Sequence, residues 1–367
     1  MLADLPVFGI FGRHESGKTT LIEALLERLR ARGLSVAVAK VHGSRLDVDR
    51  PGKDSDRLFR AGADVWMQGK DQALVRAHAS SARPCAAKPA TQGEAEVPAG
   101  ELADLARRYD LVLVEGRKRA ACPKVWILGE GETAPPPDAG DCLAVLPRGP
   151  GRLDDAWRVL DACLAERWRR TPVVGCVLIG GRSSRMGRPK HLLRTGGRTW
   201  LERTVEALRP AVGRIVLVGP GDVPPALADL ARLPDAPDAE GPMAGVLAAM
   251  RHAPWASHLV AACDLPDLTA EAAGWLLSTR SPGVWATLPH LPGRPGPEPL
   301  LAHYDFRART ILEDLAAAGR FSPSLLAGHP KVVTPAPPPD LAPAWANVNT
   351  EDDLRGRPMA AEGRPDA

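Results

Sequence analysis

Net charge and closely spaced cysteines are both scarce in this chain, and each deficit excludes a class of protein. The 47 lysines and arginines against 44 aspartates and glutamates leave a net charge of +3, which is too small for a general nucleic-acid binder. The basic residues must therefore be judged by position. The cysteines form no CxxC pair, which favours buried thiols in a reducing compartment over a zinc or iron–sulfur site. They are Cys85, Cys122, Cys142, Cys163, Cys176 and Cys263.

The sequence also lacks a long apolar segment and a leader at its start. Residues 1–18, MLADLPVFGIFGRHESGK, carry an acid at position 4 and only a short apolar run from Pro6 to Phe11. This pattern fits neither a signal peptide nor a membrane span. We therefore expect a cytoplasmic protein with no membrane partner and no nucleic-acid partner. Proline and glycine concentrate in three predicted loops, at 129–141, 289–299 and 334–343.

Apolar strands alternate with amphipathic helices in both halves of the chain, with no short internal repeat. In the first half, leucine and isoleucine recur on one face of a helix that runs from Thr19 to Arg32 and ends at Gly33. The other elements predicted for this half are strands at 7–11, 35–41, 110–116 and 124–128 and a helix at 152–169.

A second strand-then-glycine pattern begins after residue 170. Its predicted elements are an apolar strand at 173–179, strands at 214–219 and 258–263, and helices near 199–209, 242–252 and 269–279. Alternation of this kind is typical of a parallel sheet covered by helices on both faces. We therefore predict two doubly wound α/β domains, at 1–170 and 171–356, followed by a disordered tail at 357–367.

The stretch GRHESGKT at 12–19 matches the pattern G-x-x-x-x-G-K-[ST], with a strand before it and a helix after it. Glycines let backbone N–H groups turn toward phosphate oxygens, and the helix N-terminus adds positive potential. Lys18 is placed to reach the β- and γ-phosphates, and Thr19 to offer its hydroxyl to Mg²⁺. We predict a nucleotide site that contains Gly12, Ser16, Gly17, Lys18, Thr19 and Thr20.

A P-loop also needs an acid near the magnesium ion, usually where an apolar strand ends. LVLVEG offers Glu115, for which a solvated strand-end carboxylate is the alternative interpretation. Asp110 begins the same strand and lies at its wrong end. The polar stretch at 47–63 predicts a surface loop that leads into a helix, with Asp54 or Ser55 as its N-cap.

A different glycine-rich basic turn, LIGGRSSRMGRPK, occupies 178–190. It is not a P-loop, because no Gly-Lys-Ser/Thr closes it. Its spacing G-G-x-x-x-R-M-G-x-x-K suits nucleotidyl transfer, in which attack at the α-phosphorus expels pyrophosphate. Basic side chains neutralise the charge that develops in such a step, and positioning supplies much of the rest. The candidates in this turn are Arg182, Arg185, Arg188 and Lys190.

Nucleotidyl transfer also needs a divalent cation, and therefore a carboxylate at the end of a strand. HLVAACDLP at 258–266 places Asp264 directly after an apolar strand. A turn or N-cap aspartate is the alternative interpretation. Asp264 is our candidate for the metal ligand of this half of the chain.

Two further stretches carry weaker signals. EGPMAG at 240–245 is a glycine turn that opens a helix, and its backbone suits contact with a base or ribose. NVNTEDDL at 347–354 predicts a helix start with Thr350 as N-cap. Capping does not account for Asn347 or Asn349.

Over roughly residues 6 to 165 the chain resembles the GTP-binding adaptor protein of molybdopterin-guanine dinucleotide biosynthesis. The stretches that carry the resemblance are FGRHESGKTTLIEALLERLRARG, DVDRPGKDSDRLFRAGA and YDLVLVEGRKRAACPKVWIL. It implies a P-loop NTPase-like fold, with Lys53, Asp54 and Ser55 near the nucleotide and with Lys118 and Lys124 after the strand.

One departure from this family lies after Lys40. The family usually carries a histidine-rich run there, whereas this chain reads KVHGSRL with only His42. A lone histidine in such a stretch reads as a polar loop residue rather than a metal ligand.

Over roughly residues 173 to 356 the chain resembles molybdenum cofactor guanylyltransferase. LIGGRSSRMGRPK, GPMAG, CDLP, EPLLAHY and NVNTEDDL occur in the order and at about the separations of that family. The resemblance implies a Rossmann-like, glycosyltransferase-A-like fold. The GTP-binding residues it implies are Leu178, Ile179, Gly180, Gly181, Lys190, Asp235 and Asp264.

The same resemblance leaves three points open. Asp238 competes with Asp235 for the guanine side, because loop lengths blur the alignment. Arg185 is preferred over its two neighbouring arginines as the residue that faces the triphosphate. The family commonly has alanine where Ile179 stands and often glutamine where Glu298 stands, and a carboxylate at that place would be unfavourable if it faced the pterin phosphate.

Together the two resemblances imply a fused enzyme. The second domain would transfer GMP from GTP to molybdenum cofactor with Mg²⁺, and the first would bind GTP and assist. Molybdenum-insertion and molybdoenzyme-maturation proteins are the expected partners. Three alternatives stay open: cytidylyl transfer to the same cofactor, a sugar-1-phosphate nucleotidyltransferase, and a GTP-switch adaptor with a non-catalytic second domain. The turn Ile179-Gly180-Gly181 disfavours cytidylyl transfer, because related cytidylyltransferases tend to read A-A-G there. The presence of Arg185, Lys190 and Asp264 disfavours a non-catalytic domain.

Overall fold

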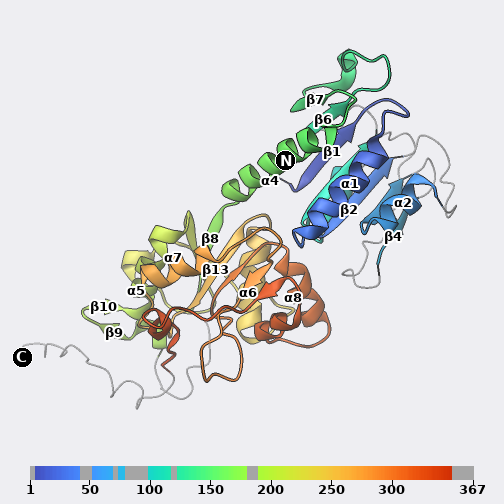
Figure 1. The fold of residues 1–367 in the computed structure, drawn as a ribbon. Coiled ribbons are helices and arrows are strands. Elements are labelled where there is room, and N and C mark those ends of the chain that lie inside the picture. Colours follow the sequence, from blue (N-terminus) through green and yellow to red (C-terminus); the bar gives the residue numbers. More distant parts are fainter. Residues whose placement is uncertain are drawn as a thin grey trace, which may run out of the picture. The chain divides into compact units, whose positions relative to one another are not determined.

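The structure is a computed structural model, and it describes residues 5–41, 52–68, 73–78, 98–116, 122–179 and 189–348. The chain divides into two compact units, Met1–Arg170 and Thr171–Ala367 (Figure 1). Each unit is an α/β sheet with helices on both faces, so the predicted fold class is confirmed. The units are described one at a time below.

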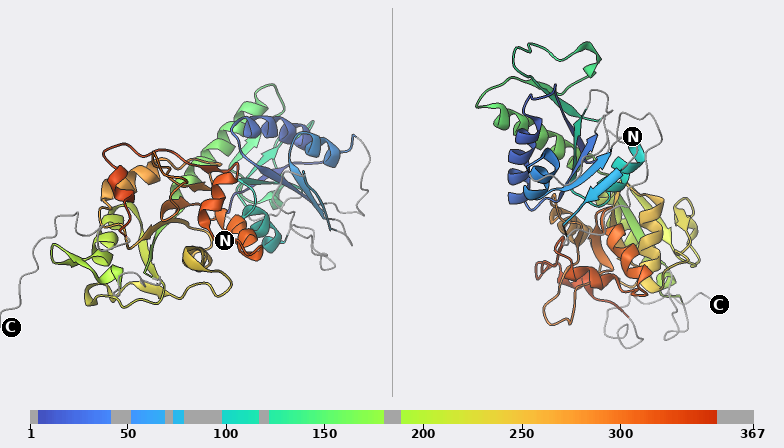
Figure 2. Two further views of the ribbon diagram at one scale, coloured as in Figure 1. Left: turned by 90° about the horizontal axis from the view of Figure 1, so that it is seen from below. Right: turned by 90° about the vertical axis from the view of Figure 1, so that its right-hand side faces the viewer.

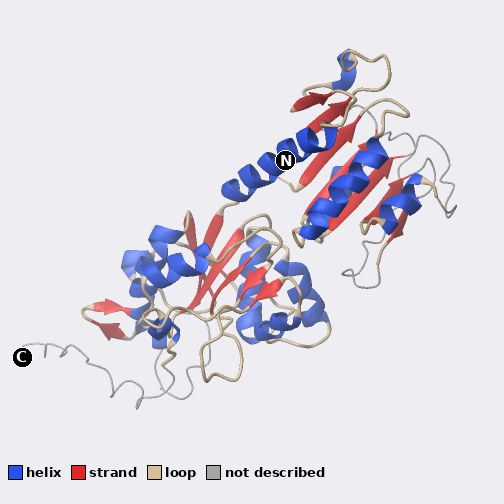
Figure 3. Cartoon of the chain, viewed as in Figure 1, coloured by secondary structure: helices blue, strands red, loops and turns tan. Residues whose placement is uncertain are grey.

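The first unit contains a seven-stranded sheet in the order β4-β3-β2-β5-β1-β6-β7. Figure 3 draws the strands in red and the helices that cover them in blue. Its strands pair in parallel except β3 and β4, which are antiparallel. The elements are β1 Val7–Phe11, α1 Lys18–Ala31, β2 Val36–Val41, α2 Asp54–Arg60, β3 Asp64–Gln68, β4 Ala73–Arg76, α3 Ala99–Ala106, β5 Leu111–Gly116, β6 Lys124–Ile127, β7 Ala144–Leu146 and α4 Arg152–Arg170.

The apolar periodicity located most of these elements. β1, β2, β5, β6, α1 and α4 lie where the sequence predicts them, and Gly33 follows α1 with φ +71°, a conformation that glycine adopts readily. The prediction for the start of α2 was wrong. Lys53 is the N-cap residue and α2 begins at Asp54, with no side-chain cap. The Asp54 carboxylate instead accepts a hydrogen bond from Lys40.

The first sheet buries one apolar layer beneath three helices. Helices α1, α2 and α4 lie along one face of the sheet (Figure 2). Leu25 of α1, Leu58 of α2 and Leu160 of α4 pack in one cluster with alternate residues of the central strands, such as Ile10 and Leu113. Because side chains alternate across a strand, the intervening residues face the other side of the sheet. The central strands β1, β2 and β5 are parallel, so their carboxyl ends meet at one edge.

The second unit also contains a seven-stranded sheet, in the order β12-β11-β8-β13-β15-β14-β16. The strands are β8 Val173–Leu178, β9 Arg194–Thr195, β10 Arg198–Thr199, β11 Arg214–Val218, β12 Ala231–Leu233, β13 Ser257–Ala262, β14 Ala286–Thr287, β15 Leu301–Tyr304 and β16 Val332–Val333. The helices are α5 Trp200–Leu208, α6 Gly241–His252, α7 Ala270–Ser278 and α8 Ala308–Ala317. β9 and β10 form a separate antiparallel pair.

This second sheet is mixed rather than wholly parallel. β8, β11, β12 and β13 are parallel, whereas β15 runs antiparallel to both β13 and β14. α6 and α8 pack in the cluster on one face, and α5 and α7 in the cluster on the other. Within the described part of the chain, none of the helices combines the length and apolarity that crossing a membrane requires.

Two histidines are buried in the second sheet, and they make its stability depend on pH. His258 of β13 and His303 of β15 are 0 % and 1 % exposed. Burial lowers the pKa of His258 to about 4 and the pKa of His303 well below its usual range. Both side chains are therefore neutral in the folded chain and protonate more readily when it unfolds.

We expect the second unit to lose stability as pH falls from about 6.5 toward 4. Unfolded histidines bind protons near pH 6.5 and the folded ones do not, so protons favour unfolding in this window; His258 alone accounts for up to about 3 kcal/mol. Hydrogen exchange of β13 peptides at pH 7.5 and pH 5.0 measures the effect. Replacing His258 with glutamine should reduce the pH dependence. An equal free energy of unfolding at both pH values contradicts the prediction.

Candidate functional site

The predicted P-loop connects β1 to α1, and its glycines stand where a side chain would not fit. A Cβ atom at Gly12 would come within 2.6 Å of the Ile127 carbonyl oxygen and of Ser16 Oγ. Gly17 has φ +90° directly before α1, a left-handed conformation that favours glycine. The loop therefore delivers the chain into the helix N-terminus in the tight turn that phosphate binding requires.

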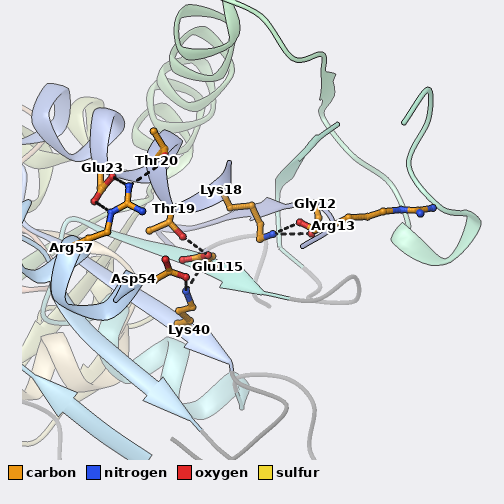
Figure 4. A network of polar contacts seen from close by, with 10 residues as sticks. All are labelled: Gly12, Arg13, Lys18, Thr19, Thr20, Glu23, Lys40, Asp54, Arg57 and Glu115. Atoms are coloured by element: carbon orange, nitrogen blue, oxygen red, sulfur yellow. Dashed lines mark hydrogen bonds and ion pairs between the residues drawn. The ribbon is translucent and has the colours of Figure 1, made fainter. Parts of the chain in front are cut away.

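The ammonium of Lys18 lies across its own loop. Nζ donates to the carbonyl oxygens of Gly12 at 3.1 Å and Arg13 at 2.5 Å (Figure 4). Desolvation lowers the pKa of Lys18, opposed by the negative charge of Glu115. A phosphate oxygen in this loop would offer the ammonium a charged acceptor in place of two neutral ones.

Glu115 ends β5 at the edge where the P-loop begins, and it is the acid that the loop contacts. Thr19 Oγ1 donates to Glu115 Oε1 at 3.0 Å, and Lys40 Nζ donates to the same oxygen at 3.3 Å. Glu115 Oε2 is buried and has no hydrogen-bond partner among the described residues. Glu115 is 3% exposed, so it is not a solvated carboxylate. Asp110 lies at the other end of the strand, as predicted, and its carboxylate accepts from the backbone and hydroxyl of Ser35.

These contacts fit a magnesium ion. Because the Thr19 hydroxyl donates its hydrogen bond to Glu115, the oxygen lone pairs remain available to a cation. The orphaned Oε2 of Glu115 has the chemistry to accept from the water shell that Mg²⁺ retains. Among the other predicted residues, Ser16 Oγ donates to the Arg13 carbonyl at 2.9 Å, and Thr20 Oγ1 accepts from Arg57 at 3.2 Å.

Sequence reasoning missed Arg152, the first residue of α4. Its guanidinium donates to the carbonyl oxygens of Ser16 at 2.8 Å, Leu128 at 2.7 Å and Pro147 at 2.7 Å. It thereby fixes the P-loop against the segments that follow β6 and β7. A cavity of about 320 Å³ lies beside it, lined in part by Gly17, Leu21 and Arg152. No motif marks this arginine, because its partners are backbone carbonyls and two of them, those of Ser16 and Leu128, are distant in sequence.

The basic turn of the second unit begins at the end of β8. Leu178 and Ile179 are both buried there, and the Ile179 amide donates to the Val218 carbonyl of β11 at 2.8 Å. The next described residue is Pro189, directly before Lys190. The predicted site residues Gly180, Gly181 and Arg185 lie outside the described residues, as do Arg182 and Arg188.

The structure brings Lys190 and Asp264 together at the carboxyl edge of the second sheet. Lys190 Nζ lies 3.6 Å from Asp264 Oδ2 and donates to the Val348 carbonyl at 2.9 Å. The Val348 amide in turn donates to the Asp264 carbonyl at 3.1 Å. Val348 was missed from sequence, although it lies inside the NVN stretch that capping did not explain. Its buried side chain packs with Leu193 and Trp200.

The carboxylate of Asp264 is largely desolvated. Burial raises its pKa, and the charge of Lys190 opposes the rise. Its Oδ1 is buried and has no hydrogen-bond partner among the described residues. A buried carboxylate oxygen of this kind fits a divalent cation, which would compensate its charge.

The two aspartates proposed for the guanine side have different surroundings. Asp238 forms a bidentate ion pair with Arg251, at 2.5 and 2.8 Å. Asp235 lies instead beside α6: a Cβ atom at Gly245 would approach Asp235 Oδ1 to 3.4 Å and Leu178 Cδ2 to 2.7 Å. Asp235 is therefore the aspartate that lies near the end of β8.

Glu298 lies just before β15, the strand that pairs with β13. Burial raises the pKa of Glu298, and the negative charge of Asp264 contributes to the rise while Arg294 opposes it. Arg294 lies 3.7 Å from its carboxylate. The two acids therefore share one edge of the sheet. Of the C-terminal asparagines, Asn347 is half-buried, and Asn349 and Thr350 lie outside the described residues.

The fold and the two sites define the class of each unit. The first unit is a P-loop nucleotide-binding domain. The second is an α/β unit with the Lys190–Asp264 pair at the carboxyl edge of its sheet. A family model described as molybdopterin guanine dinucleotide synthesis protein B matches residues 7–146. A second, described as MobA-like NTP transferase domain, matches residues 175–332.

Named relatives match each half of the chain. A molybdenum cofactor guanylyltransferase from Rhizobium meliloti is 36% identical over 195 residues, which are 49% of this chain and 87% of that protein. A molybdopterin-guanine dinucleotide biosynthesis adapter protein from Haemophilus influenzae is 33% identical over 156 residues, 41% of this chain and 79% of that protein. Among solved structures, molybdopterin-guanine dinucleotide biosynthesis protein A from Archaeoglobus fulgidus is 27% identical with a TM-score of 0.42, covering 50% of this chain and 95% of that one.

The chain belongs to the molybdenum cofactor guanylyltransferase family through its second unit and to the molybdopterin-guanine dinucleotide biosynthesis adapter family through its first. It is thus a nucleotidyltransferase fused to a P-loop unit, as the sequence predicts.

Proposed function

We propose that the second unit transfers GMP from GTP to the terminal phosphate of molybdenum cofactor, giving molybdopterin guanine dinucleotide and pyrophosphate. The observation that supports this most directly is the Lys190–Asp264 pair, held at one edge of the sheet by the Val348 peptide. It places a cation and a candidate metal ligand together where the basic turn ends. Membership of the guanylyltransferase family supplies the two substrates.

In this reaction a phosphate oxygen of the cofactor attacks the α-phosphorus of GTP. The new O–P bond forms as the bond from the α-phosphorus to the bridging oxygen of the β-phosphate breaks, and pyrophosphate leaves. As this bond breaks, negative charge builds up on the leaving pyrophosphate, and Lys190 neutralises part of that charge. Arg185 is proposed for the same task. No covalent intermediate with the protein is needed, so the residues act by binding and orienting the two phosphates.

We propose Mg²⁺ as the metal of both units. Asp264 would hold it in the transferase unit through its buried carboxylate, and Thr19 in the P-loop unit, with Glu115 orienting the hydroxyl. When bound, the ion polarises phosphate oxygens and neutralises their charge. Asp235 is our proposal for the guanine side, because Asp238 is already paired with Arg251.

The first unit is proposed to bind GTP and to assist the second. The P-loop, with Lys18 and Thr19 at a helix N-terminus, supports this role. We further propose that the chain works in the cytoplasm, where GTP is available, and that its product passes to molybdenum-insertion and molybdoenzyme-maturation proteins.

Pyrophosphate release with different nucleotides tests this proposal. With Mg²⁺ and molybdenum cofactor, we expect GTP to give pyrophosphate at least about ten-fold faster than CTP or ATP, because the guanine-side contacts distinguish the bases. Omitting the cofactor is the control, since hydrolysis of GTP alone should give no pyrophosphate. Release with CTP alone would make the chain a cytidylyltransferase. A chain that releases none with any nucleotide would be an adaptor with a non-catalytic second unit.

A further inference from the structure

Lys40 belongs to no phosphate-loop pattern, yet it lies in the nucleotide site of the first unit. It stands at the carboxyl end of β2, where the register pairs it with Glu115 of β5. Its side chain is 9% exposed. The ammonium donates to Asp54 Oδ2 at 2.5 Å and to Glu115 Oε1 at 3.3 Å. Figure 4 shows it beneath Thr19, on the same side of the loop as the Thr19–Glu115 bond.

Lys40 and Lys18 place two ammonium groups at one edge of the sheet. Desolvation is the main cause that lowers the pKa of Lys18, and the charge of Lys40 lowers it further. Two like charges in a poorly hydrated site disfavour each other, and an anion between them removes that cost. Asp54 and Glu115 offset the pair in the nucleotide-free chain. A triphosphate supplies a denser negative charge than either carboxylate.

The two carboxylates that hold Lys40 differ in how easily they can be replaced. The Glu115 side chain is 4% exposed. Thr19 interacts with both carboxylates, so the difference between them lies in their exposure. Asp54 is the first residue of the short helix α2, and its side chain is 48% exposed. An incoming phosphate oxygen can therefore displace Asp54 from Lys40 at little cost, whereas Glu115 remains in place.

We propose that Lys40 binds the terminal phosphate of the nucleotide in the first unit and so distinguishes a triphosphate from a diphosphate. The inference rests on the proposed function, in which this unit binds GTP. Lys18 lies on the P-loop itself and is placed to reach the β-phosphate, which GDP and GTP share, as well as the γ-phosphate. Lys40 approaches from β2, outside the loop. Asp54 competes with the terminal phosphate for the ammonium and leaves it when a triphosphate binds.

Replacing Lys40 with methionine tests the inference. Hydrogen exchange of peptides from residues 12–25, measured in the full chain with Mg²⁺, reports nucleotide binding at the P-loop alone. We expect K40M to bind guanosine 5′-(β,γ-imido)triphosphate at least about ten-fold more weakly than the unmodified chain, with GDP affinity changed less than about two-fold. D54N should bind the triphosphate as tightly as the unmodified chain or more tightly, because the competitor is lost.

Arg60→Met is the matched control. It removes one positive charge from α2, where Arg60 is exposed and pairs with Asp56, and it should leave the ratio of GDP to triphosphate affinity unchanged. An equal loss of both affinities in K40M, or a loss in D54N like that in K40M, overturns the inference, because Lys40 would then be a structural ion pair. If neither nucleotide protects the P-loop of the unmodified chain, GTP binding by the first unit is refuted, and the inference falls with it.

Discussion

Replacing Asp264 with alanine is expected to abolish transfer, lowering the rate of pyrophosphate release at least about a thousand-fold. Its carboxylate is the candidate metal ligand of the transferase unit, and Oδ1 has no hydrogen-bond partner in the described part of the chain. Without it the cation is held by the nucleotide alone, and the triphosphate loses its fixed position against Lys190. The measurement is pyrophosphate release with Mg²⁺, GTP and molybdenum cofactor.

The loss should not be caused by unfolding. Burial raises the pKa of Asp264, so the ionised carboxylate is disfavoured in the metal-free fold, and removing it is not expected to destabilise the chain. Asp264→Asn keeps the size of the side chain and should be equally inactive. Asp267→Ala, in an exposed position of the same turn, should keep full activity. Substantial transfer by Asp264→Ala or Asp264→Asn would assign the metal to another residue.

Replacing Lys18 with alanine is expected to weaken GTP binding by the first unit about a hundred-fold while transfer by the second unit is largely kept. A charged hydrogen bond to phosphate contributes about 1.5 to 3 kcal/mol, and Lys18 is placed to make more than one. The residue acts in a unit separate from the Lys190–Asp264 pair. Hydrogen exchange of the P-loop peptides and pyrophosphate release, measured on the same protein, separate the two effects.

Arg28→Ala is the matched control for Lys18. Arg28 lies on the same helix and pairs with Asp154 away from the loop, so its loss should change neither GTP binding nor transfer. If Lys18→Ala stops transfer outright while Arg28→Ala does not, nucleotide binding in the first unit must control the second. That result would replace an assisting role with an obligatory one.

Local sequence was enough to find the P-loop and the strands that flank it. Lys18 and Thr19, which we propose to bind the nucleotide, lie within eight consecutive residues whose conformation depends on their own glycines. Glu115 was found because a carboxylate that follows an apolar strand falls at the carboxyl edge of a parallel sheet. In both cases the prediction depends only on residues that are close to one another in the sequence. Arg185 and its glycine neighbours were predicted in the same way, but they lie outside the described residues and stay a prediction.

Contacts between distant segments decided the remaining parts of the sites. Lys40 and Glu115 are 75 residues apart and meet only because β2 pairs with β5 in one register. A shift of that register by one residue would send Lys40 to the other face of the sheet. The role of Asp54 also depends on a distant contact. Its position before a helix predicts an N-cap, but its carboxylate pairs with the buried ammonium of Lys40.

The sequence by itself therefore determined two α/β units and the families to which they belong, and it predicted two phosphate-binding turns of different design. Apolar periodicity, glycine positions and short motifs are local properties, and they suffice for these conclusions. Only the tertiary structure decided that Lys40 joins the P-loop site, that Arg152 fixes the loop, and that the Val348 peptide links Lys190 to Asp264. Strand register and packing set these contacts, and neither can be obtained from the spacing of residues along the chain.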